Sequence, residues 1–424
     1  MFNHRPPPAI IQNGQGSGKI TQNPFVKQVG AHARIRTQDH EFTFTPAGEI
    51  RFIRGLGRQW PHPEEQLKRT DGNDWVYYSV GDDSTEDGVI SWMGEYYLPS
   101  LPYPSNGIWD LNYRENPAVM AAFGAWSQLF ADLWDLSRQN SLPPSALALI
   151  QKILARDDQT LFNRSQELKE IIGTPISVLP PDTRQVDYQV IPLIIAHGCR
   201  YQCQFCCVQP REKFQERTRE NIDEQLQRLA AFYGENLENY NALFLGNQDA
   251  LAAGDDLILE GIEKAGRHLG FSDKESLRPR LFLFGSVDAL MAKSQGFFQA
   301  LDQTAFDTWI NVGLESVDGP TLKAIGKPLT PKKVQKAFEK ICTLNQDLSR
   351  VELSCNFLMG QDMPPAHYQG ITTLLSSVSS APVKGSVYLS PVKGSPKKRE
   401  LLPLFRGIKS QSRLPVFIYL IQRF

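Results

Sequence analysis

The chain has 424 residues, 41% of them apolar, so it is long enough for two domains and can bury an ordinary core. Its 45 Lys and Arg residues nearly balance its 46 Asp and Glu residues. This balance argues against a broad basic field and disfavours nucleic acid as a partner. The first residues contain no apolar signal segment, and the apolar run Val416–Ile421 is too short to span a bilayer. We therefore expect a cytoplasmic protein with no membrane partner.

The first part of the chain predicts a small α+β domain that resembles no family. The first thirty residues, rich in Pro, Gly, Gln and Asn, are expected to lack regular structure. Alternating apolar residues predict short strands over 33–54 and a further strand near 75–78. Apolar residues at helical spacing predict helices over 117–138 and near 145–155. A turn-rich Leu179–Asp182 follows, and we place a domain boundary near 184. The prediction is an accessory domain over 1–184 and a second domain over 185–424.

After the boundary, strands and helices alternate. Continuous apolar runs predict strands that are buried on both faces. They lie at 190–195, 242–245, 281–284, 309–312, 351–358 and 387–389. Helix-like segments separate them near 222–233, 255–268, 287–301, 331–345 and 366–378. Six strands in this rhythm favour an α/β fold of the partial (β/α)6 barrel type, and a doubly wound sheet is the rival.

The cysteines are concentrated directly after the first of these strands. None of the six precedes residue 199, and three of them give the spacing C-x3-C-x2-C at Cys199, Cys203 and Cys206. In an α/β barrel this loop lies on the catalytic face. Three thiolates can hold three irons of a [4Fe–4S] cluster and leave the fourth iron open to a small molecule. The spacing therefore favours an iron–sulfur site.

Two other readings of these cysteines stay open. A structural zinc site needs four ligands, and Cys207 or His197 could supply the fourth. A redox pair could form between Cys203 and Cys206. The alternative function is accordingly a zinc- or cluster-binding regulatory protein without catalysis.

The cysteine loop resembles the signature of the radical S-adenosylmethionine (radical SAM) superfamily, which has this spacing and an aromatic residue, here Phe205, before the third cysteine. The resemblance implies a [4Fe–4S] cluster on Cys199, Cys203 and Cys206, with S-adenosylmethionine on the open iron. It also implies a one-electron donor such as flavodoxin or ferredoxin. Reductive cleavage of S-adenosylmethionine would then give a 5′-deoxyadenosyl radical that acts on an unknown organic substrate.

Short motifs at later strand ends carry the resemblance to about residue 395. Gly246 matches one glycine of the Gly-Gly-Glu segment that receives the methionyl amino group, but Asn247 and Gln248 replace the other two residues. Ser286 stands where a polar side chain meets the cofactor, and it could also cap the next helix. Glu315, in the segment Gly-Leu-Glu-Ser, is similar to the acid that binds the ribose hydroxyls.

The last two strands resemble the family's adenine region. The segment Asn356–Gly360 fits the glycine motif of the fifth strand, and Tyr388 lies on the sixth strand. Altogether, the resemblance implies these cofactor-binding residues: Phe205, Gly246, Ser286, Glu315 and Tyr388. The chain lacks an Asp-x-His-x-x-Gly motif before the barrel, which disfavours a cobalamin module. Too few cysteines remain for a second cluster.

Overall fold

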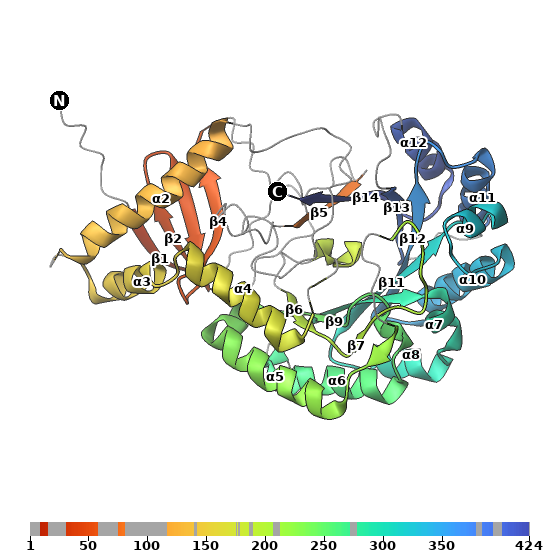
Figure 1. Cartoon of the computed structure of the whole chain (residues 1–424), viewed down its shortest axis with the longest axis horizontal. Helices are drawn as coiled ribbons and strands as arrows, with labels where there is room; N and C mark the ends of the chain where they lie inside the picture. Colours follow the sequence, from red (N-terminus) through yellow and green to blue (C-terminus); the bar gives the residue numbers. More distant parts are fainter. Residues whose placement is uncertain are drawn as a thin grey trace.

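The fold is taken from a computed structural model of the chain (Figure 1). It describes residues 9–15, 31–57, 75–80, 117–139, 142–174, 176, 179–185, 190–206, 213–271, 278–378, 384–392 and 401–423. Within this part of the chain there is a four-stranded antiparallel sheet, an eight-stranded parallel sheet and a two-stranded ladder. None of the described helices combines the length and apolar composition that crossing a bilayer requires.

The smaller sheet is an antiparallel meander built from the first strands. Its order is β1-β2-β3-β4, with bounds Ala9–Gln15, Ala31–Arg36, His40–Phe44 and Ile50–Gly55. The predicted strands over 33–54 are confirmed, whereas the expectation that the first thirty residues lack regular structure is wrong for β1. Backbone pairing with β2 orders this segment although its composition is typical of a loop.

Helices α2 (Pro117–Ser137) and α3 (Pro144–Leu154) pack beside this small sheet, as Figure 1 shows, and confirm the two predicted helices. The indole of Trp126 on α2 lies 6.3 Å from the ring of Phe42 and 6.0 Å from that of Phe44. An amphipathic face of α2 therefore buries aromatic surface against β3. Helix α4 (Asp158–Ile172), which follows, was not predicted because its first part is dominated by polar residues.

The larger sheet is built from the part of the chain that begins at residue 190, apart from strand β5 of the first half. Its order is β5-β14-β13-β12-β11-β10-β9-β6, and every neighbouring pair is parallel. The bounds are β5 Trp75–Val80, β6 Val190–Leu193, β9 Ala242–Leu245, β10 Arg280–Ser286, β11 Asp307–Glu315, β12 Val351–Met359, β13 Val387–Pro391 and β14 Val416–Arg423. From β6 to β14 the strands follow chain order without a reversal, which a doubly wound sheet would contain.

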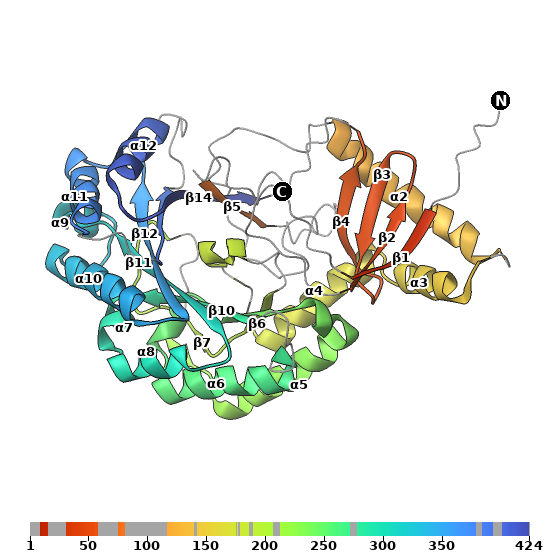
Figure 2. The ribbon, with the colours of Figure 1, turned by 180° about the vertical axis from the view of Figure 1, so that it is seen from behind.

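The predicted partial (β/α)6 barrel is therefore confirmed, with two further strands at one edge. Strands β6 and β9–β13 are the six predicted ones. The sheet curves, and its helices cover the convex side (Figures 1 and 2). These are α5 Arg219–Tyr233, α6 Asp255–His268, α7 Val287–Ala292, α8 Gln295–Asp302, α9 Gly319–Ala324, α10 Pro331–Asp347, α11 Pro365–Ser376 and α12 Leu401–Gln411.

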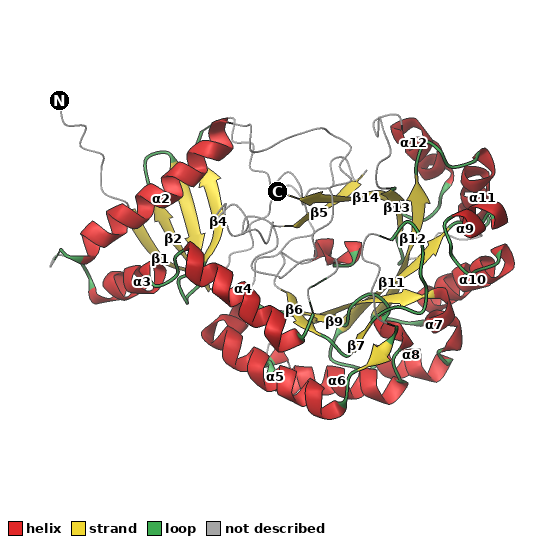
Figure 3. Ribbon diagram, viewed as in Figure 1, coloured by secondary structure: helices red, strands yellow, loops and turns green. Residues whose placement is uncertain are grey.

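The segment predicted as one helix over 287–301 is two helices. Lys293 ends α7 in an extended conformation, and the hydroxyl of Ser294 then caps α8 by accepting from the Phe297 amide at 3.1 Å. A serine N-cap starts a new helix more readily than it continues an old one. The colouring by secondary structure in Figure 3 shows how loops at one end of the strands join each strand to its helix.

A short 3-10 helix, η4 (Pro181–Gln185), lies on the concave side of the large sheet, where it is yellow-green in Figure 1. Its Asp182 is buried and accepts hydrogen bonds from the hydroxyls of Ser354 on β12 (2.6 Å) and Tyr388 on β13 (2.8 Å). Two amides extend this polar network. Asn311 Nδ2 donates to Ser354 Oγ at 2.7 Å, and Asn356 Nδ2 donates to Asn311 Oδ1 at 2.5 Å. The segment before the barrel therefore contributes a carboxylate to the barrel's inner face.

Candidate active site

The three signature cysteines lie in the loop after β6, beside the carboxyl ends of the parallel strands. Cys203 is buried, and Cys199 and Cys206 are half-buried. The Tyr201 amide donates to Cys199 Sγ at 3.4 Å, and the Cys206 amide donates to the carbonyl of Cys203 at 3.2 Å. The fourth neighbouring cysteine, Cys207, lies outside the described residues.

Burial raises the pKa of the Cys199 thiol, which the hydrogen bond from Tyr201 partly offsets. Burial also raises the pKa of Cys203 to about 11, against the attraction of the Lys327 ammonium. Both thiols are therefore protonated at neutral pH until a metal displaces the proton. Three sulfur donors shielded in part from water, with an N–H group aimed at one sulfur, suit an iron–sulfur cluster.

Within the described residues, no three Cys, His, Asp or Glu side chains converge on one metal-ion position. A tetrahedral zinc ion needs such convergence, because all its ligands share one centre. A cluster does not, since each thiolate holds a different iron. Thiolates are the donors that hold such a cluster, and this loop offers three of them.

The cysteine loop rests on the segment between β11 and α10. The Gln204 amide donates to the carbonyl of Ile325 at 2.9 Å. Gly326 has φ +67°, and a Cβ there would lie 3.1 Å from Gln204 Cγ. A glycine at 326 thus allows both the left-handed backbone and the close approach of the two loops.

An ion pair lies at the end of β11, next to the thiols. Lys327 Nζ is 3.2 Å from Glu315 Oε1, and both side chains are almost completely buried. Glu315 has φ +65°, an uncommon conformation for a residue with a Cβ, at a bulge in the pairing of β11 with β12. A Cβ at Gly313 would lie only 2.4 Å from the same carboxylate oxygen. Gly313 therefore makes room for the carboxylate against the strand.

The loop after β9 contributes a second acid that the sequence did not single out. Asp249 Oδ1 accepts from the Ser286 amide at 2.7 Å, whereas its buried Oδ2 has no hydrogen-bond partner among the described residues. Burial raises the pKa of Asp249 to about 6, and its charge acts on the Cys199 thiol. Gly246, four residues after the start of β9, has φ +79°, and a Cβ there would lie 2.5 Å from Ala250 Cβ. The glycine thus lets the loop fold back tightly.

Ser286 is buried at the end of β10 and acts as the N-cap of α7, where its Oγ accepts from the Ala289 amide at 3.1 Å. The same hydroxyl also lowers the pKa of the neighbouring Asp249 carboxyl through a hydrogen bond, so capping does not keep Ser286 away from the candidate site. Phe205 is half-buried and packs against the core beside its neighbouring cysteines. Tyr388 is different: its side chain is fully buried and donates to Asp182 on the inner face. Only its backbone is left for the predicted contact with adenine.

The charges of Lys327 and Asp249 act on the Cys199 thiol, and those of Lys327 and Glu315 act on the Cys203 thiol. These five side chains therefore lie close together. Sequence reasoning missed Lys327 and Asp249 as members of this group. The only sequence signal was position: Asp249 lies four residues beyond the end of β9, and Lys327 lies in the segment between β11 and α10. Such positions are usually solvated, and nothing local distinguishes a buried acid from an exposed one.

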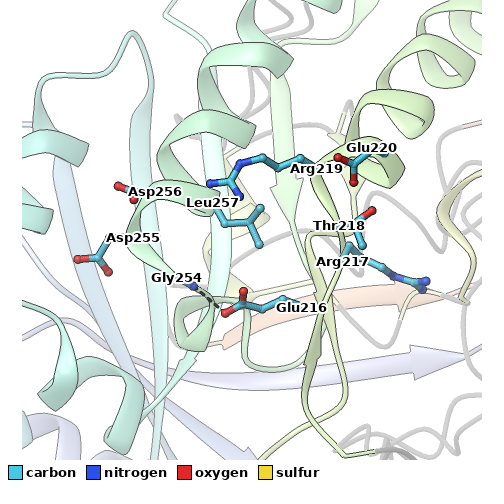
Figure 4. Close-up of a pocket in the computed structure, with 9 residues that line it drawn as sticks. All are labelled: Glu216, Arg217, Thr218, Arg219, Glu220, Gly254, Asp255, Asp256 and Leu257. Carbon is cyan, nitrogen blue, oxygen red and sulfur yellow. Dashed lines mark hydrogen bonds between the residues drawn. The ribbon is translucent and has the colours of Figure 1, made fainter.

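A pocket of about 410 Å³ lies nearby, between the first residues of α5 and α6, and is lined by residues 216–220 and 254–257 (Figure 4). Glu216 Oε1 accepts from the Gly254 amide at 2.9 Å, as the dashed line shows. Arg219 pairs with Glu260 at 2.7 Å, and Asp255 pairs with Lys293. Three of its charged side chains are thus engaged within the protein, and the pocket holds none of the signature residues.

Comparison with known proteins places the site in context. Residues 193–361 match the family model described as the Radical SAM superfamily. No curated protein sequence matches the chain. Among solved structures, the chain is similar to the cobalamin-dependent S-adenosylmethionine radical enzyme OxsB with aqua-cobalamin bound, at 16% identity and a TM-score of 0.33. That match covers 52% of this chain and 31% of OxsB, so the chain spans about a third of that protein.

Two further structures are similar at a comparable level. A radical SAM methyltransferase from Sphaerobacter thermophilus matches at 13% identity and a TM-score of 0.36, covering 54% of this chain and 66% of that one. Methylornithine synthase (PylB) matches at 10% identity and a TM-score of 0.33, covering 68% of this chain and 81% of that one. These likenesses are too weak to carry a conclusion about function.

Proposed function

We propose that this chain cleaves S-adenosylmethionine reductively to act on an organic substrate. Residues 193–361 match the family model of the radical SAM superfamily, whose enzymes use a [4Fe–4S] cluster and S-adenosylmethionine. One observation carries the proposal: the cysteine loop and the buried Glu315–Lys327 pair adjoin each other at the carboxyl ends of the parallel strands. Active sites of α/β barrels lie at this face.

In this proposal Cys199, Cys203 and Cys206 hold the cluster. The chemistry that a bound cluster supplies is transfer of one electron to the sulfonium, which breaks the bond to C5′ and leaves methionine and a 5′-deoxyadenosyl radical. The electron comes from a one-electron donor such as flavodoxin or ferredoxin. The chain's part is to hold the cofactor, exclude water and orient the bond that breaks.

Glu315 binds the ribose hydroxyls in this proposal. Its Oε1 is engaged by Lys327 at 3.2 Å, and a carboxylate accepts several hydrogen bonds, so Oε2 can accept from the sugar. Lys327 supplies the opposite charge beside this carboxylate. Gly246, Ser286 and Phe205 line the neighbouring strand ends and complete the cofactor site, and Tyr388 offers its backbone to adenine.

Asp249 takes the place of the missing acid of the Gly-Gly-Glu segment. A buried carboxylate oxygen without a partner in the described structure costs free energy unless a donor arrives. The methionyl ammonium is such a donor, and it also favours the ionised carboxylate. We therefore propose that Asp249 binds the ammonium group.

The test is anaerobic reconstitution followed by measurement of iron, acid-labile sulfide and 5′-deoxyadenosine formed with dithionite. We expect about four irons and four sulfides per chain, as one cluster requires. Alanine at Cys199, Cys203 or Cys206 should abolish both cluster and product. Cys342→Ala, on α10, is the matched control, and Cys207→Ala should also be tolerated. Stoichiometric zinc without sulfide would instead support the regulatory zinc protein.

A further inference from the structure

Helix α11 contacts the strained turn that carries Glu315. The turn at 315–318 begins with Glu315 at φ +65° and continues with the Ser316 amide donating to the Leu314 carbonyl at 2.9 Å. A residue with a Cβ is held in this conformation only where its surroundings over-determine it. Contacts from α11 help to hold Glu315 and the turn in this conformation.

The first contact is from His367, which is fully buried on α11. Its Nε2 lies 2.9 Å from the Leu358 carbonyl, and its Nδ1 lies 2.8 Å from Ser316 Oγ. A carbonyl only accepts, so Nε2 carries the proton and Nδ1 accepts from the Ser316 hydroxyl. Ser316 Oγ in turn accepts from the Asp318 amide at 3.0 Å. The histidine therefore fixes both the hydroxyl and the amide of the turn.

The second contact comes one helical turn further along. A Cβ at Gly370 would lie 2.8 Å from Val317 Cγ2, so the helix backbone and the turn are in direct contact there. His367 and Gly370 are three residues apart and share a face of α11. Polar and apolar contacts thus hold consecutive residues of the turn.

The turn connects directly to the cluster loop. Asp318 caps α9 by accepting from the amide and hydroxyl of Thr321 at 2.9 and 2.6 Å. At the other end of α9, Ile325 accepts the amide of Gln204 in the cysteine loop. Lys327, two residues after Ile325, then forms the ion pair with Glu315 at the start of the turn. Displacement of the turn would therefore move both the ribose acid and the support of the cluster loop.

We propose that His367, with Gly370, is a positioning residue that presets Glu315 for S-adenosylmethionine. The proposal rests on the proposed function for the identity of the ligand, but not for the geometry of the turn. Without the Nδ1 contact, the buried Ser316 hydroxyl lacks its acceptor, and the turn can adopt other conformations. Apparent affinity then falls in proportion to the fraction of molecules that keep the preset turn.

Two substitutions separate the two nitrogen contacts of His367. His367→Asn can place an acceptor at the Nδ1 position and keep the bond from Ser316. His367→Gln can place a donor at the Nε2 position and keep only the bond to Leu358. We expect His367→Gln to raise the Kd for S-adenosylmethionine about tenfold, which corresponds to a preset turn in roughly a tenth of the molecules. His367→Asn should stay close to wild type.

Gly370→Ala is the variant that separates positioning from stability. Alanine favours a helix interior over glycine by roughly 0.5–1 kcal/mol, so the helix itself should gain. The added Cβ displaces Val317, and we expect weaker S-adenosylmethionine binding with an unchanged or raised melting temperature. A merely structural role for this face would lower affinity and melting temperature together.

Hydrogen exchange of the apoprotein gives a readout that needs no ligand. Peptides covering 315–327 and 199–206 should exchange faster in His367→Gln and Gly370→Ala than in wild type or His367→Asn. Unchanged exchange in both would overturn the inference, whether or not the cofactor binds. Faster exchange with no S-adenosylmethionine binding by wild type would sustain the positioning of the turn and overturn the proposed function instead.

Discussion

The ammonium of Lys327 lies 3.2 Å from Oε1 of Glu315, and both side chains are shielded from water at the end of β11. An ion pair that is removed from solvent is costly to break, because the remaining charge has no partner and little water. The pair also stands next to the Cys203 thiol, whose pKa responds to both charges.

Neutralising one member of the pair should lower the free energy of unfolding more than neutralising both members does. Lys327→Met should lower the free energy of unfolding by about 3–5 kcal/mol, the range for a buried pair that loses one partner. The double variant Lys327→Met with Glu315→Gln should recover part of this loss. Urea titration of the four proteins gives the coupling energy, and additive losses would show that the pair is not coupled.

Glu315→Gln alone should weaken S-adenosylmethionine binding by about 1.5–3 kcal/mol, the range for hydrogen bonds to a charged group, while the iron content stays unchanged. Equilibrium dialysis and iron analysis of the same preparation are the measurements. Loss of iron together with affinity would mean that Glu315 supports the cluster loop rather than the cofactor.

Gly313→Ala should move the carboxylate without removing it. The new Cβ would lie 2.4 Å from Glu315 Oε1 and 3.2 Å from Lys327 Nζ, so the pair must shift. We expect a fall in S-adenosylmethionine affinity similar to that of Glu315→Gln. Gly319→Ala, at the first residue of α9, is the matched control, since its Cβ would meet Pro331 at an ordinary 3.6 Å. Equal affinities of the two variants would contradict the placement of Glu315.

Asp249→Asn should separate stability from binding. The pKa of Asp249 is raised to about 6 by burial, so between pH 4 and 6 the folded protein binds more protons than the unfolded chain, and stability falls as pH rises through this window. At pH 8 the neutral amide avoids the cost of the buried charge, on the order of 3 kcal/mol. We expect a more stable variant that binds S-adenosylmethionine less tightly. A variant of unchanged affinity would remove Asp249 from the cofactor site.

His367 should make the fold sensitive to mild acid. Burial lowers its pKa below the ordinary value of 6.5, so the unfolded chain takes up a proton before the folded one does. Stability from this residue is complete above pH 6.5 and is lost as pH falls toward the lowered pKa. Urea midpoints between pH 5 and 7.5 should therefore fall more steeply in wild type than in His367→Asn. Parallel slopes would argue against a buried neutral imidazole.

The sequence correctly predicted the strands that are buried on both faces of the sheet. Strands β6 and β9–β13 appear as apolar runs because both faces are covered, and the cysteine spacing is a local pattern. The same reasoning noted the run at 416–421 only as too short for a membrane and missed its place as β14. Asp249, Lys327 and His367 were missed for a different reason. Their importance depends on burial against distant segments, and no local period marks a polar residue that tertiary contacts enclose.

Asp182 has a practical consequence for anyone who wishes to shorten the protein. A fragment that starts at 186 would leave the hydroxyls of Ser354 and Tyr388 buried without their acceptor. It would also lose β5 and bare the hydrogen-bonding edge of β14, where a second molecule could add as a strand. Such a fragment should be insoluble even though it retains every signature residue, so the smallest soluble version is expected to begin upstream of β5.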